Sequence, residues 1–133
     1  MPGRRILVVE DDADNRAALR ALLETWGHAV EEAADGEAGL RLVLSGQPDL
    51  LLVDISMPGG MDGLEVARRL RATPGGGRLY LIALTGRGGE DITTDLRVSG
   101  FDAHLLKPCD PNLLNELISA AGPRGAGRHT LNE

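Results

Sequence analysis

The sequence predicts an α/β fold, with a five-stranded parallel sheet and five helices. Three observations support this prediction. Five short segments rich in apolar residues alternate along the chain with five segments of helical spacing. Three of the short segments are apolar almost throughout, which is typical of strands buried on both faces. The length of 133 residues suits one domain with a core of its own.

The first strand is predicted at residues 6–9, and acidic residues follow it at 10–12. A helix begins at about Asp14, whose side chain is a good N-cap, and apolar residues recur in it at helical spacing. Gly27 ends this helix as a C-cap residue. Residues 29–33 form a second strand, and their mixed character suits an edge of the sheet.

The middle of the chain supplies two further strands. A second helix is predicted at about residues 37–44, and the third strand then runs through apolar residues to its end at Asp54. A third helix covers about residues 64–72. The fourth strand, residues 79–84, is again almost wholly apolar. The arginines of the third helix are expected mostly on its outer face: Arg68, Arg69 and Arg71.

The last third of the chain completes the alternation. A fourth helix is predicted at about residues 91–99, and residues 103–106 form a short fifth strand. The fifth helix begins with Asp110 as its N-cap and Pro111 at its first position. Residues 122–133 are rich in glycine and arginine, and we expect them to form a disordered tail.

The strand order 2-1-3-4-5 agrees with these features. It places the three apolar strands in the centre and the mixed or short second and fifth strands at the edges. With right-handed crossovers this order gives a flavodoxin-like, doubly wound sheet. Its switch point falls between strands one and three, so the acids at the ends of these two strands are expected to meet in one crevice.

The strand ends at that edge carry Glu10 and Asp11, Asp54, Thr85 and Lys107. Three carboxylates without thiolates or histidines make a hard, all-oxygen site, which selects Mg²⁺ or Mn²⁺ over zinc or copper. A carboxylate beside such a cation can be a nucleophile towards phosphorus, while a hydroxyl and an ammonium hold the other oxygens. Each residue alone would be explained as a turn, cap or solvated residue. Together they favour a functional interpretation.

Composition excludes several classes of protein. The net charge is −6, from 20 acidic and 14 basic residues with no basic cluster, which argues against nucleic acid as a direct partner. No apolar run approaches the length of a membrane span, and no signal peptide is present, so we expect a cytoplasmic protein without a membrane partner. The single cysteine, Cys109, excludes an internal disulfide and a thiolate-rich metal site.

Over about residues 4–121 the chain resembles a receiver domain of a two-component response regulator. Each matching motif is weak alone, but five of them in this order and spacing are specific. Residues 100–104 resemble receivers of hybrid histidine kinases, and a single-domain receiver is the other form considered. The matching motifs are residues 6–12, 52–58, 61–63, 83–86 and 106–108.

The resemblance implies that Asp54 is the phosphoacceptor and receives a phosphoryl group from a histidine kinase or a histidine phosphotransfer protein. It also implies that Mg²⁺ is the cofactor, with Mn²⁺ as a possible substitute. Asp11, Asp54 and the backbone carbonyl of Ser56 would bind the metal directly, and Glu10 would act through water.

By the same resemblance, Thr85 would donate a hydrogen bond to the phosphoryl oxygens and Lys107 would form an ion pair with them. The Lys107–Pro108 peptide bond is expected to be cis. His104 occupies the place of an aromatic residue that, in many receivers, switches together with the threonine. It is either that switch residue or an exposed histidine of an edge strand.

The leading prediction is therefore a phosphorylation-switched signalling domain of a phosphorelay that changes its contacts with a downstream protein. It is not an enzyme beyond its own magnesium-dependent phosphorylation and dephosphorylation. A pseudo-receiver that acts only as a binding module is an alternative. An aspartyl-nucleophile phosphatase is less favoured, because such enzymes need an acid two residues after the nucleophile, where this chain has Ser56.

Overall fold

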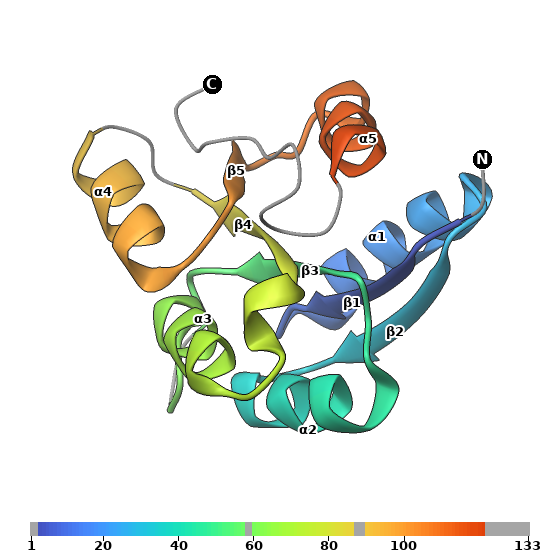
Figure 1. The fold of residues 1–133 in the computed structure, drawn as a ribbon. Helices are drawn as coiled ribbons and strands as arrows, with labels where there is room; N and C mark the ends of the chain where they lie inside the picture. The colour runs from blue at the N-terminus through green and yellow to red at the C-terminus, as the bar shows by residue number, and fades with distance from the viewer. Residues whose placement is uncertain (1–2, 58–59, 87–89, 122–133) are drawn as a thin grey trace.

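The computed structural model describes residues 3–57, 60–86 and 90–121. Strands and helices alternate along the chain (Figure 1). They are β1 (Arg5–Val9), α1 (Ala13–Thr25), β2 (Ala29–Ala33), α2 (Gly36–Gly46), β3 (Leu50–Asp54), α3 (Gly63–Ala72), η1 (Gly76–Arg78), β4 (Tyr80–Thr85), α4 (Glu90–Ser99), β5 (Ala103–Leu106) and α5 (Pro111–Ala120).

All five strands are parallel and lie in the order β2-β1-β3-β4-β5, which confirms the predicted topology. Helices α1 and α5 lie on one side of the sheet, and α2, α3 and α4 lie on the other (Figure 1). Strands β3 and β4 are buried along their whole length, as their apolar sequences predicted. The core therefore runs through the centre of the sheet and is covered on both faces.

Helix α1 begins two residues earlier than predicted. Asp12, not Asp14, is its N-cap: its backbone is extended, and its side chain accepts a hydrogen bond from the amide of Asn15 at 2.9 Å. The prediction for α5 is confirmed, because Asp110 caps it and Pro111 is its first residue. The predicted tail, residues 122–133, lies outside the described residues.

Arg71 was predicted to lie mostly outward, and this was wrong. Its guanidinium donates hydrogen bonds to the carbonyls of Gly76, Leu79 and Gly100 and forms an ion pair with Asp102 at 2.8 Å. The side chains of Arg71 and Asp102 are 14% and 4% exposed. Asp102 also accepts a hydrogen bond from the amide of Leu81. This buried pair joins α3 to the turn before β4 and to the segment before β5.

A close approach of backbones places the start of α3 next to the end of β3. A Cβ atom on Gly63 would lie 2.7 Å from the carbonyl oxygen of Asp54 and 2.8 Å from the Cα of Ile55, so only glycine fits without a shift. Asp62 caps the helix by accepting a hydrogen bond from the amide of Glu65. Helix α3 therefore packs directly against the strand end that carries Asp54.

Within the described residues, no helix is both long enough and apolar enough to cross a lipid bilayer.

Candidate functional site

The register of the sheet brings the predicted site residues together at the carboxyl ends of the strands. Val9 pairs with Val53, so the residues that follow them, Glu10 and Asp54, lie side by side. On the other side of β3, Thr85 ends β4. The amide of Lys107 donates to the carbonyl of Thr85 at 2.8 Å, which fixes the chain just after β5.

Asp54 lies at the centre of this group and is only 2% exposed. Its Oδ1 atom accepts a hydrogen bond from the amide of Ser56 at 3.0 Å, and its Oδ2 atom lies 2.9 Å from Nζ of Lys107. A buried carboxylate is stable only with partners of this kind. The Ser56 contact seen here is its amide, so the predicted role of its carbonyl stays a prediction.

Two further acids complete the cluster. Glu10, Asp11 and Asp54 each offer a carboxylate oxygen, and these three oxygens lie within 4.8 Å of one another. Glu10 is 1% exposed; it accepts a hydrogen bond from the amide of Asp12 at 3.1 Å, and its Oε1 lies 3.8 Å from Nζ of Lys107. Asp11 is exposed. The cluster thus combines two buried acids with one that faces solvent.

Burial and the neighbouring charges in this cluster shift two pKa values. Burial raises the pKa of the Glu10 carboxyl to about 7; the amide of Asp12 and Lys107 oppose this shift, and the charge of Asp54 adds to it. Burial alone would lower the pKa of Lys107, but its hydrogen bond to Asp54 and the charges of Asp54, Glu10 and Asp11 outweigh this and raise it. Lys107 is therefore charged at neutral pH.

The donor set fits a hard divalent cation. Three carboxylates face one ammonium group, so the ionised cluster has negative charge in excess. Burial and, to a smaller extent, the charge of Asp54 raise the pKa of Glu10, so ionised Glu10 is unfavourable here without a compensating cation. Oxygen ligands without sulfur or imidazole favour Mg²⁺ or Mn²⁺. The residues that could hold such a cation are Glu10, Asp11 and Asp54.

Thr85 and His104 occupy the neighbouring strands. Thr85 is 1% exposed at the end of β4. His104 lies in the edge strand β5, pairs with Ala83 of β4 and is half-buried, so the alternative of an exposed edge-strand histidine is wrong. Its Nδ1 atom is buried and has no hydrogen-bond partner among the described residues, and burial lowers its pKa. Whether His104 is a switch residue stays a prediction.

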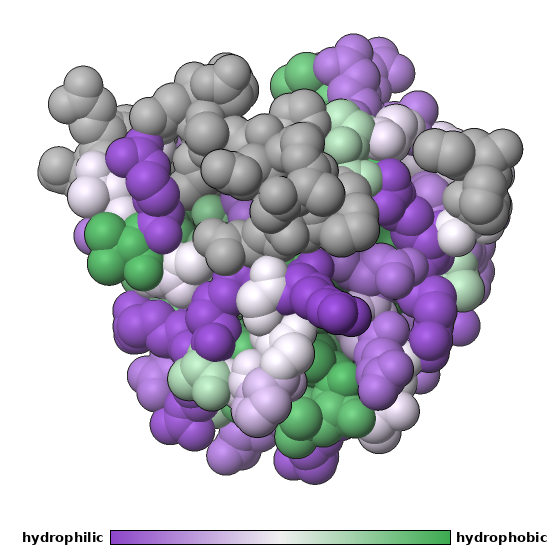
Figure 2. Space-filling view, viewed as in Figure 1, coloured by the Kyte–Doolittle hydropathy of each residue, from purple (hydrophilic) through white to green (hydrophobic). Residues whose placement is uncertain are grey.

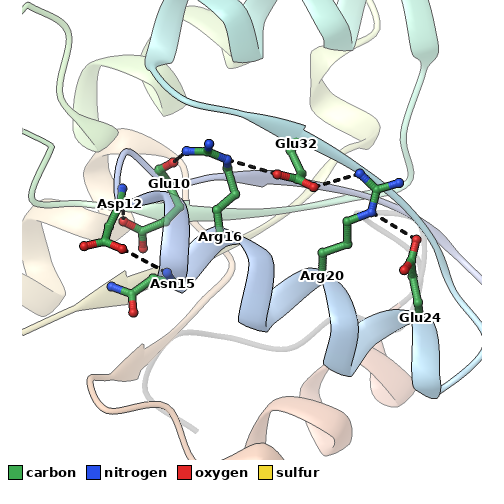
Figure 3. A network of polar contacts seen from close by, with 7 residues as sticks. All are labelled: Glu10, Asp12, Asn15, Arg16, Arg20, Glu24 and Glu32. Atoms are coloured by element: carbon green, nitrogen blue, oxygen red, sulfur yellow. Dashed lines mark hydrogen bonds and ion pairs between the residues drawn. The ribbon is translucent and has the colours of Figure 1, made fainter.

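Sequence reasoning missed one contact of the site. Arg16 of α1 donates from Nη1 to the backbone carbonyl of Glu10 at 2.8 Å and from Nε to Oε1 of Glu32 at 3.0 Å (Figure 3). A bond to a backbone carbonyl has no sequence signature. The only available signal was the position of Arg16, one helical turn after the acidic residues.

One groove of the described residues lies away from the acidic cluster. It measures about 920 Å³ and is lined at the amino ends of β3 and β4 by residues that include Leu50, Leu79 and Tyr80. Figure 2 shows a largely hydrophilic surface with a hydrophobic patch over α2, the helix that carries Leu44, which is 66% exposed. The acids lie at the opposite edge of the sheet, where the strands end. We assign the chemistry to that edge because of its carboxylate ligands, and not because of the size of a groove.

Glu10 predicts a dependence of stability on pH in the metal-free protein. Its carboxyl ionises at about 4.5 in the unfolded chain and at about 7 in the folded chain. Its contribution to stability is therefore fully present below pH 4.5 and is lost as the pH rises to 7. Glu10→Gln cannot ionise, so we expect it to gain stability over wild type across this range, on the order of 3 kcal/mol.

Urea denaturation of both proteins at several pH values in EDTA measures this difference. A constant gap between Glu10→Gln and wild type from pH 4 to pH 8 would contradict the assigned burial of the Glu10 charge.

Comparisons with known proteins show which family this chain is similar to. The family model of the response regulator receiver domain matches residues 6–119. The chain is 40% identical over 126 residues to the transcriptional regulatory protein AfsQ1 of Streptomyces coelicolor. That match covers 94% of this chain and 54% of AfsQ1, so the chain spans about half the length of that relative.

Two further matches cover most of this chain and most of the matched protein. An uncharacterized 14.6 kDa protein in the sodA1 3′ region of Leptolyngbya boryana is 42% identical over 113 residues, with 85% of this chain and 86% of that protein covered. The receiver domain of sensor histidine kinase PA1611 from Pseudomonas aeruginosa superposes with a TM-score of 0.80 at 30% identity and covers 88% and 95% of the two chains. That structure holds a magnesium ion in its active site cleft.

Proposed function

The chain belongs to the response regulator receiver domain family, whose acidic pocket serves magnesium-dependent phosphorylation of an aspartate, and we propose that Asp54 is the aspartate that accepts the phosphoryl group. One observation carries this proposal. Asp54 is the only acid of the cluster that contacts both a backbone amide and Lys107 within 3.0 Å, among the described residues. Its carboxylate is thereby held at the point where the other two acids converge.

The proposed step is a phosphoryl transfer. An oxygen of the Asp54 carboxylate forms a bond to phosphorus, and the phosphorus–nitrogen bond of a donor phosphohistidine breaks, with its electron pair going to the imidazole. The product is an aspartyl phosphate. Lys107, 2.9 Å from Asp54, then pairs with the phosphoryl oxygens, and Thr85 donates its hydroxyl hydrogen to one of them.

Mg²⁺ is the proposed cofactor, and Mn²⁺ fits the same ligands. Asp11, Asp54 and the carbonyl of Ser56 would hold it directly, with Glu10 acting through water. When bound, the cation neutralises negative charge on the phosphoryl oxygens. The acidic cluster supports this assignment, as does the magnesium ion in the PA1611 receiver.

The proposed partners follow from the family. Receiver domains act with histidine kinases, and the donor is proposed to be such a kinase or a histidine phosphotransfer protein. The downstream partner is proposed to be a protein that contacts α4, β5 and α5, where Val98, Leu106 and Leu113 are 79%, 52% and 48% exposed. Receiver domains are typically cytoplasmic, and we propose the same location here, without direct contact to nucleic acid or membrane.

Acetyl phosphate provides the test of this function, because it donates a phosphoryl group without a partner protein. Incubated with acetyl phosphate and Mg²⁺, the chain is expected to gain the mass of one phosphoryl group, as measured by intact-protein mass spectrometry. The gain is expected to disappear when EDTA replaces Mg²⁺.

A chain that gains no mass under either condition would be a pseudo-receiver. Steady release of phosphate without an adduct would instead indicate a phosphatase, although the receiver family is not a conventional enzyme family.

A further inference from the structure

Arg16 of α1 connects the acidic site at the end of β1 to the neighbouring strand β2. Its guanidinium donates from Nη1 to the carbonyl oxygen of Glu10 at 2.8 Å and from Nε to Oε1 of Glu32 on β2 at 3.0 Å (Figure 3). The carbonyl belongs to the peptide that joins Glu10 to Asp11, where the chain leaves β1 and turns towards α1. The side chain of Arg16 is 19% exposed, so this contact lies largely out of solvent.

Glu32 holds Arg16 in place. Its Oε1 atom binds Arg16, and its Oε2 atom lies 2.7 Å from Nη1 of Arg20, which also pairs with Glu24 at 3.0 Å (Figure 3). The hydrogen bond from Arg20, together with that from Arg16, outweighs burial and lowers the pKa of Glu32, so this carboxylate stays ionised at neutral pH. Charge-assisted bonds therefore fix the orientation of the Arg16 guanidinium.

Asp11 depends on the backbone for its position. Its side chain is exposed and has no hydrogen bond to the described residues, although its carboxylate oxygen lies within 4.8 Å of those of Glu10 and Asp54. By contrast, the carboxylates of Glu10 and Asp54 are each bound to a backbone amide and lie near Lys107. The direction of the Asp11 side chain therefore follows from the orientation of the Glu10–Asp11 peptide, which Arg16 binds.

We propose that Arg16 is a positioning residue of the metal site: by binding the Glu10 carbonyl while Glu32 holds its other side, it orients Asp11 towards the same point as Asp54. This inference rests on the proposed function, because it concerns the affinity of that site for Mg²⁺. Arginine suits the role since its planar fork reaches two acceptors at once, whereas lysine offers one point charge. Partners that orient metal ligands typically change metal affinity by 10- to 100-fold when they are removed.

Isothermal titration of Mg²⁺ into metal-free protein tests the proposal. Arg16→Gln is expected to bind Mg²⁺ about 10-fold more weakly than wild type. Arg16→Lys, which keeps the charge but only one donor group, is expected to lie between the two. Arg20→Gln is the matched control, because it removes the other arginine on Glu32 while Arg16 keeps its own bonds to Glu32 and Glu10; its affinity should stay much closer to that of wild type than the affinity of Arg16→Gln does.

A second readout separates positioning from a general loss of structure. The rate of phosphorylation by acetyl phosphate should need about 10-fold more Mg²⁺ for half-saturation in Arg16→Gln, yet reach the wild-type rate at saturating Mg²⁺. Thermal melts in EDTA show whether Arg16→Gln and Arg20→Gln are destabilised to a similar extent.

Three outcomes would overturn the proposal in different ways. Wild-type affinity in Arg16→Gln, or an equal loss of affinity in Arg20→Gln, would overturn the positioning role and leave the proposed function standing. If the wild-type chain itself bound no Mg²⁺, the proposed function would fail, and the role of Arg16 would fail with it.

Discussion

Asp54→Asn is expected to abolish the phosphoryl adduct completely. The amide has the shape of the carboxylate but lacks its nucleophilic charge, so no bond to phosphorus forms even when Mg²⁺ and acetyl phosphate are in excess. The variant should remain folded, because it removes one of two neighbouring buried carboxylates and Lys107, whose side chain is 32% exposed, can turn to solvent. Intact mass measures the adduct, and circular dichroism measures the fold.

Asp14→Asn is the matched control for this experiment. It makes the same chemical change at an exposed position of the first turn of α1, outside the acidic cluster. Its adduct should form at the wild-type rate. An adduct of undiminished yield on Asp54→Asn would show that another side chain accepts the phosphoryl group.

Arg71→Met is expected to cause the largest loss of stability, about 3–5 kcal/mol. The substitution leaves Asp102 buried without its cation, since that side chain is 4% exposed and Arg71 lies 2.8 Å away. It also removes the hydrogen bonds that three backbone carbonyls accept, from Gly76, Leu79 and Gly100. Urea denaturation followed by far-ultraviolet circular dichroism gives the change in the free energy of unfolding.

Arg69→Met is the control from the same helix. Arg69 pairs with Glu65 at 2.9 Å, but the two side chains are 57% and 41% exposed, so solvent screens the pair. Its loss should cost less than about 0.5 kcal/mol. Similar losses for the two arginine variants would contradict the buried role assigned to Arg71.

The sequence predicted the strand order and the meeting of the site residues for one reason. In a parallel sheet, every strand ends at the same edge, so residues that follow the strands are brought together by topology alone. Glu10, Asp54 and Thr85 needed only the correct strand boundaries to be placed. These boundaries were clear because the central strands are apolar almost throughout.

Helix boundaries were predicted less well, and the reason is local. Asp12 and Asp14 are both suitable N-caps, and periodicity cannot decide between them. The choice depends on which residue keeps an extended backbone after β1 turns, which the structure gives as Asp12.

Contacts from side chains to backbone carbonyls were not predicted from the sequence. Arg71 was placed outward because other residues form the apolar face of this helix, and charged residues are usually solvated. Its partner Asp102 lies 31 residues later in the chain, and its carbonyl acceptors carry no side-chain signal. The bond from Arg16 to the Glu10 carbonyl was missed for the same reason.

Locating the acyl phosphate within the chain tests the central claim most directly. Borohydride reduces an aspartyl phosphate to homoserine, so treatment after reaction with acetyl phosphate and Mg²⁺, followed by peptide mass mapping, marks the acceptor. The structure predicts homoserine at position 54 and unmodified aspartate at positions 11 and 12. Homoserine at any other position, or an adduct that leaves Asp54 unmodified, would contradict the account.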